Sequence, residues 1–122
     1  MWGFGDESSG RLSINENITL QEGKHVGWHF SLNQTCPIRL HVRHNDGACV
    51  NVYVMSDEEY QNYTQNLNII TYTDLSSECV YSDFENIAYL QAGSYVLVVE
   101  LPTIHDGEDS YAVAGVRCEE LE

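Results

Sequence analysis

The fold is decided by residues 38–54, which read IRLHVRHNDGACVNVYV. On both sides of Asn45-Asp46-Gly47, apolar and polar residues alternate, which is the pattern of a strand with one buried and one exposed face. The central triplet has the length of a three-residue hairpin loop, and its glycine is free to take a left-handed backbone conformation. We therefore expect the two runs to pair as a hairpin in which Val42 lies opposite Val50 and both apolar faces coincide.

The same alternation continues on either side of this stretch. Residues 24–32 place Val26, Trp28 and Phe30 on one face, and this pattern predicts a further hairpin between residues 24–32 and 36–44. Other strands are expected at residues 69–73, 79–82, 94–101 and 111–118, with the last two joined as a hairpin. Many short strands separated by turn residues predict an all-β fold, namely an antiparallel β-sandwich that is jelly-roll-like.

One short helix is expected between the strands. Ser56 can cap its N-terminus, and Glu59 stands three residues later, where it can complete a capping box. The helix should end near residues 64–66.

Two segments carry a resemblance to a known family. Residues 50–55 read VNVYVM and precede the helix, while residues 90–99 read LQAGSYVLVV and have the spacing L-x-x-G-x-Y-x-x-V. This order resembles bacterial pre-peptidase C-terminal domains, over about residues 24–118 of the chain. The resemblance implies an accessory β-sandwich without catalytic activity, of a kind that in some cases binds calcium or polymeric substrates. The cysteines and the histidine-rich strands differ from the family, so no binding residue is carried over.

The size and the charge of the chain limit its possible partners. Its 122 residues predict one domain, with residues 1–10 as a flexible Gly- and Ser-rich arm and residues 11–122 as a single β-sandwich domain. Five Lys and Arg against 19 Asp and Glu give a formal net charge of −14. Such a field repels phosphate backbones and anionic lipids, so we expect no nucleic-acid partner and no membrane insertion.

Cysteines and glycosylation sequons indicate an oxidising compartment. The four cysteines are Cys36, Cys49, Cys79 and Cys118, and the sequons begin at Asn17, Asn33 and Asn62. A Cys36–Cys49 bridge is disfavoured because the two residues lie at opposite ends of the predicted hairpin. We favour Cys36–Cys118 with Cys49–Cys79; Cys36–Cys79 with Cys49–Cys118 stays open, as do four reduced cysteines in a cytosolic protein. The oxidised alternative places the protein outside the cell or in the lumen of the secretory pathway.

The predicted pairing of residues 24–32 with 36–44 gathers basic side chains on one outer face. The residues of this basic strip are His25, His29, Arg39, His41 and Arg43. In one interpretation, neighbouring carboxylates neutralise them in ordinary cross-strand pairs. In the other, the strip docks an anion, an acidic glycan, or the acidic surface of a protein partner or of a second copy.

Two groups of residues could bind a metal ion. Asp106, Glu108 and Asp109 surround Gly107 in one loop, and oxygen-rich loops of this kind can bind Ca²⁺, although their spacing matches no EF-hand. His25, His29 and His41 could hold zinc or copper if their strands pair, but the adjacent arginines disfavour a dication there.

The function that best fits these features is non-catalytic. The sequence has no G-x-S-x-G, H-E-x-x-H or C-x-x-C motif and no phosphate-binding glycine loop. We therefore expect an extracellular interaction module, as an ectodomain, an accessory subunit or a self-assembling subunit, that uses the basic strip. The alternatives are a calcium-supported carbohydrate- or protein-binding module attached to an enzyme, and a small hydrolase with a carboxylate pair.

Overall fold

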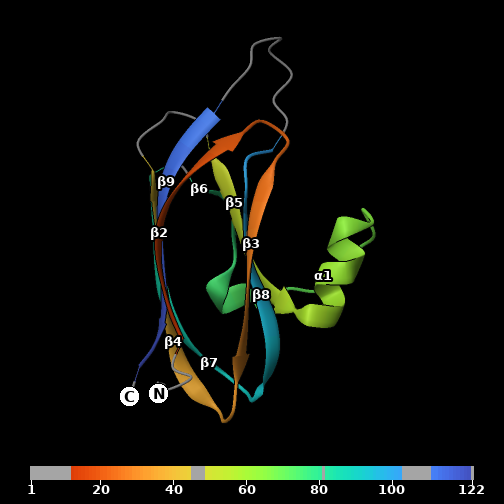
Figure 1. The fold of residues 1–122 in the computed structure, drawn as a ribbon, viewed down its shortest axis with the longest axis vertical. Coiled ribbons are helices and arrows are strands. Elements are labelled where there is room, and N and C mark those ends of the chain that lie inside the picture. Colours follow the sequence, from red (N-terminus) through yellow and green to blue (C-terminus); the bar gives the residue numbers. More distant parts are fainter. Residues whose placement is uncertain (1–11, 45–48, 81, 103–110, 122) are drawn as a thin grey trace, which may run out of the picture.

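The computed structural model of the chain describes residues 12–44, 49–80, 82–102 and 111–121. Two four-stranded antiparallel sheets pack face to face, with strand orders β2-β9-β4-β7 and β3-β8-β5-β6 (Figure 1). The strands are β2 (Ser13–Gln21), β3 (His25–Leu32), β4 (Cys36–His44), β5 (Val50–Ser56), β6 (Ser77–Val80), β7 (Asp83–Leu90), β8 (Gly93–Glu100) and β9 (Tyr111–Glu120). The helix α1 spans Asp57–Thr64, and one 3-10 turn, η2, spans Thr73–Leu75. The predicted fold class, an all-β antiparallel sandwich with one short helix and a disulfide, is confirmed.

The core lies between the two sheets and is built from the alternating residues of the central strands. Ile38, Leu40 and Val42 of β4 face inward, and so do Val50, Val52 and Val54 of β5; all six are fully buried. Removing this apolar surface from water is the main stabilising contribution, at about 25 cal/mol for each Å² buried.

The predicted hairpins are wrong, because the strands that were expected to pair lie in opposite sheets. β4 pairs with β7 and β9, while both β3 and β5 pair with β8. β8 and β9 are likewise divided between the sheets. Alternation specifies which side chains face inward, but an arch that crosses from one sheet to the other buries the same side chains as a hairpin does. The triplet at residues 45–47 lies outside the described residues.

The helix is confirmed. The Ser56 hydroxyl accepts a hydrogen bond from the Glu59 backbone N–H at 3.1 Å, which is the first half of the predicted capping box. The Glu59 carboxylate instead accepts from the backbone N–H of Ile70 at 2.9 Å. This contact ties the segment that follows α1 back to the first turn of the helix.

The weaker strand predictions have mixed outcomes. No strand forms at residues 69–72, where one backbone hydrogen bond joins Tyr72 N–H to the Val54 carbonyl at 2.9 Å. The strand expected at 79–82 corresponds in part to β6. β2 and β7 form without having been predicted, and they are the two edges of the first sheet. Residues 1–10, predicted to be an arm, lie outside the described residues.

Candidate binding surface

The predicted basic strip does not form as one surface. His25 and His29 belong to β3, whereas Arg39, His41 and Arg43 belong to β4 in the other sheet, so the two groups face away from each other. The reason is the absent hairpin between β3 and β4. A zinc or copper site made of His25, His29 and His41 is excluded by the same separation. Across the described residues, no group of three or more His, Cys, Asp or Glu is placed to hold a metal ion.

Helix α1 covers the outer face of the β3-β8-β5-β6 sheet (Figure 1). Met55, Val96 and Val98 are fully buried beneath it, in a small second core to which Tyr60 and Tyr63 add their rings. β8 is consequently buried on both of its faces, which explains the uninterrupted apolar run Val96–Val99.

The two histidines of β3 hold this helix in place. His25 Nε2 lies 3.1 Å from the Tyr60 hydroxyl, and His29 Nδ1 lies 3.2 Å from the Asp57 carboxylate. Burial, followed by the Glu100 carboxylate, raises the pKa of Tyr63, so this phenol remains a neutral hydrogen-bond donor. These contacts assign His25 and His29 a structural role in docking α1.

The outer face of the β2-β9-β4-β7 sheet, in contrast, carries no other described element (Figure 1). We call it the open face. Its outward positions are Ser13, Asn15, Asn17, Thr19 and Gln21 of β2, Val113, Gly115, Arg117 and Glu119 of β9, Pro37, Arg39, His41 and Arg43 of β4, and Asp83, Glu85, Ile87 and Tyr89 of β7. Three members of the predicted strip therefore remain together here, joined by Arg117.

Carboxylates on the open face neutralise part of this charge. Arg39 Nε lies 3.9 Å from Glu85, and Arg39 Nη1 lies 3.5 Å from Glu119. Asp83 is shared by His41 Nε2 at 2.7 Å and Arg43 Nε at 3.7 Å. The interpretation in which neighbouring acids neutralise the strip thus holds in part. Exposed pairs of this kind contribute little to stability, about 0–1 kcal/mol each.

The charge of the open face differs from that of the rest of the chain. Three of the five Lys and Arg residues lie on it. They cancel its three carboxylates, so the formal charge of −14 is carried entirely by the remainder of the protein. Apolar side chains are also exposed there: Tyr89 is 74% exposed, and about half of Ile87 and of Val113 is accessible.

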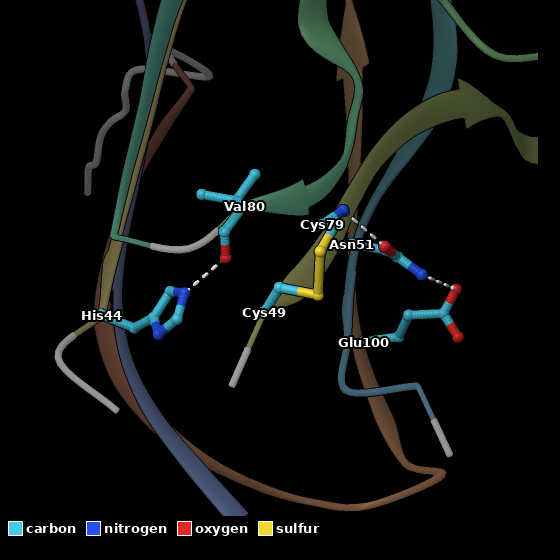
Figure 2. The surroundings of a disulfide bond; sticks show 6 residues. All are labelled: His44, Cys49, Asn51, Cys79, Val80 and Glu100. Carbon is cyan, nitrogen blue, oxygen red and sulfur yellow. Dashed lines mark hydrogen bonds between the residues drawn. A yellow bond between two sulfur atoms is a disulfide. The ribbon is translucent and has the colours of Figure 1, made fainter. Parts of the chain in front are cut away.

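One of the two predicted disulfides is confirmed. Cys49 and Cys79 are joined with a Cα–Cα distance of 4.6 Å and link the start of β5 to β6 (Figure 2). The Asn51 side chain accepts a hydrogen bond from the Cys79 backbone N–H at 2.8 Å. From the other sheet, His44 donates through Nε2 to the Val80 carbonyl (Figure 2).

The predicted Cys36–Cys118 bridge is wrong. Cys118 lies opposite Leu40 on β4, four residues along the strand from Cys36. Four residues of strand span about 13 Å, whereas bridged cysteines have Cα atoms within about 7 Å. Both residues are instead buried in the core.

The remaining predicted sites are the three sequons and the loop with the calcium ligands. Asn17 is exposed on the open face, Asn33 is exposed between β3 and β4, and Asn62 is partly buried on α1. Whether these sequons carry glycans stays a prediction. The proposed calcium ligands Asp106, Glu108 and Asp109 lie outside the described residues.

Three hollows on the described surface have volumes of about 360, 430 and 560 Å³, and each contains at most one carboxylate. None of them therefore offers the carboxylate pair that a glycoside hydrolase requires. No helix within the described ranges has the length and apolar character needed to span a membrane.

Comparisons with known proteins reveal similarity of structure and not of sequence. No protein-family model matches the chain, and no curated protein sequence matches it. Among solved structures, the pre-peptidase C-terminal domain of collagenase from Bacillus anthracis matches with a TM-score of 0.63 and 15% sequence identity. The match covers 88% of this chain and 90% of that domain. The resemblance is confirmed for the fold.

Proposed function

We propose that the chain is a non-catalytic binding module of a larger extracellular protein, and that the open face binds an extracellular polymer. The observation that carries the proposal is the contrast between the two outer faces. α1 covers one of them, whereas the other exposes arginines and large apolar side chains on three of its four strands. A strand surface of this kind fits an extended chain better than a small molecule, which needs a concave site.

Two findings support an extracellular location and attachment to an enzyme. The Cys49–Cys79 disulfide fits an oxidising compartment. The structural neighbour is a domain of a collagenase, which favours attachment to a secreted protease or another polymer-degrading enzyme. In this proposal the module holds the polymer, and a separate domain carries the catalysis.

The test is retention on insoluble polymers. Collagen, chitin, cellulose and cross-linked pectin are each mixed with the wild-type chain and with the double variant Arg43→Gln/Ile87→Ser of the open face. The matched control is Lys24→Gln/Leu67→Ser, because Leu67 is 55% exposed and Ile87 is 48% exposed. Lys24 and Leu67 both lie outside the open face.

We expect at least one polymer to retain the wild type and the control but not the open-face variant. Equal retention of all three proteins, or no retention of the wild type on any polymer, would contradict the proposal. Sedimentation of the same proteins reports any self-association separately.

A further inference from the structure

The middle of the open face contains one outward position without a side chain. Gly115 lies opposite Asn17 on β2 and opposite Arg43 on β4. The next outward position on its own strand is Arg117, which lies opposite His41. Apart from its neighbours in sequence, the only described atom within 4 Å of a Cβ placed on Gly115 is Asn17 Oδ1, at 3.2 Å. Gly115 therefore leaves a gap in the row of outward side chains; Asn17 borders this gap, and the strand register places Arg43 and Arg117 at the neighbouring outward positions.

The guanidinium groups of Arg43 and Arg117 retain N–H donors that can bind an anion. The Arg43 side chain is 71% exposed, and its Nε lies 3.7 Å from the Asp83 carboxylate. Within the described part of the chain, no carboxylate lies within ion-pair distance of Arg117. A guanidinium presents five N–H donors in a planar fork that matches the oxygens of a carboxylate or a sulfate.

Two of the three carboxylates of the open face lie away from β2. Asp83 and Glu85 are on the opposite edge strand, β7, while Glu119 lies near the end of β9, opposite Ser13. In contrast, all outward positions of β2 are exposed and neutral, and all can form hydrogen bonds. They are Ser13, Asn15, Asn17, Thr19 and Gln21. In a chain with a net charge of −14, this is a row of five outward positions without an acid, and Arg117 of the neighbouring strand lies opposite Asn15.

We infer that Asn17, Gly115, Arg43 and Arg117 form an oxyanion site for the carboxylate or sulfate groups of an anionic polysaccharide. The inference rests on the proposed function and assigns its ligand class. The row on β2 favours a polysaccharide over an acidic peptide. Its amide and hydroxyl groups are spaced at about 7 Å along the strand and can form hydrogen bonds with hydroxyl groups repeated along a sugar chain. A peptide made of acidic residues would be attracted only by Arg43 and Arg117 and repelled by the net negative charge of the protein, without the hydrogen bonds that sugar hydroxyls form along β2.

The site is tested with soluble probes and isothermal titration calorimetry on protein made without N-glycans. The probes are polygalacturonate oligomers for carboxylate, dextran sulfate for sulfate, unmodified dextran as the neutral polymer, and poly-glutamate as the acidic peptide. We expect binding of polygalacturonate, dextran sulfate or both, and at least tenfold weaker binding of dextran and of poly-glutamate. Equal affinity for dextran or for poly-glutamate would overturn the inference.

Three variants test which residues contribute to binding. Arg117→Gln should weaken binding of the anionic polysaccharide about tenfold, as expected for one lost charge-assisted contact. Gly115→Val should also weaken it, because a side chain then fills the gap. Lys24→Gln is the matched control and should change binding less than twofold, since Lys24 is exposed and lies outside the open face. Urea unfolding of each variant confirms that the fold is intact.

Unchanged binding by both Arg117→Gln and folded Gly115→Val would overturn the oxyanion site. If the open-face double variant still loses its polymer in that case, the proposed function stands and only the ligand assignment fails. If that variant also binds normally, both fail together.

Discussion

The Tyr95 hydroxyl closes the turn between β7 and β8. It donates to the Gln91 carbonyl at 2.6 Å, and its ring stacks on Phe30 with ring centroids 5.5 Å apart. Tyr95 is 4% exposed, so water cannot easily replace the lost donor. We expect Tyr95→Phe, which keeps the ring and removes the hydroxyl, to lower the free energy of unfolding by about 1 kcal/mol.

Urea unfolding followed by far-UV circular dichroism measures this change. Tyr89→Phe is the control, because Tyr89 is 74% exposed and the same substitution should have almost no effect there. Equal losses in the two variants would indicate that the hydrogen bond to Gln91 does not contribute.

The cysteines have two distinct chemical states. One pair forms the Cys49–Cys79 disulfide, and the other two residues, Cys36 and Cys118, are buried. Burial, with a smaller contribution from the Glu119 carboxylate, raises the pKa of the Cys118 thiol to about 12. We expect iodoacetamide at pH 8 to leave the folded chain unmodified, because the reactive thiolate is suppressed and inaccessible.

Mass spectrometry measures the number of alkylated cysteines. Unfolding in urea without a reductant should allow two alkylations, and unfolding with a reductant should allow four. Modification of the folded protein, or four alkylations without a reductant, would contradict the arrangement of the cysteines.

Asn17 belongs both to a sequon predicted from the sequence and to the oxyanion site inferred from the structure. Its side chain lies over the backbone of Gly115, so a glycan on this sequon would cover the oxyanion site. Occupancy of Asn17 and binding of a polysaccharide on the open face therefore exclude each other. The sequons at Asn33 and Asn62 lie elsewhere and do not conflict with the open face.

At the scale of elements, α1 has a side-chain cap at its N-terminus. Ser56 accepts from the Glu59 backbone N–H, and no residue of α1 is itself fully buried. We expect Ser56→Ala to destabilise the protein by about 1 kcal/mol and to increase hydrogen exchange in α1. Ser56→Asp is the control, because its carboxylate can still accept this hydrogen bond. Equal destabilisation by the two substitutions would show that the cap contributes nothing.

Alternation in the sequence identified most strands but not their neighbours. The inward residues of β4 and β5 were predicted correctly, since a half-buried strand must alternate. The pairing failed because a hairpin and a crossing between sheets bury the same residues. The basic strip depended on that pairing, and two of its five residues, His25 and His29, consequently lie on the other sheet.

β2 and β7 were not predicted because their sequences do not alternate cleanly between apolar and polar residues. Their inward rows are interrupted by polar residues, Glu16 opposite Val116 in β2 and Asn86 opposite Leu40 in β7. The Asn86 side chain donates to the Asp74 carbonyl at 2.6 Å, a long-range contact that no sequence pattern reveals. Without β2, neither its neutral row nor the position of Gly115 beside Asn17 could be predicted.

At the scale of the whole molecule, charge is distributed unevenly. The open face is formally neutral, and the remaining surface carries the whole net charge of −14. This net charge repels an anionic ligand at long range. For the proposed anionic polysaccharide we therefore expect slow association at low salt, and attraction only at contact with the arginines and with the neutral row of β2.

The same excess of carboxylates opposes folding through self-repulsion. Raising NaCl from 0.01 to 0.15 M shortens the screening length from about 30 to about 8 Å. At pH 7 we expect this change to stabilise the fold by about 1 kcal/mol and to raise the thermal midpoint by about 4 °C. Near pH 4.4, the pI calculated from the sequence, the net charge vanishes and the same salt step should have little effect. Thermal unfolding at both pH values measures the difference; an equal salt effect at the two would show that the net charge does not limit stability.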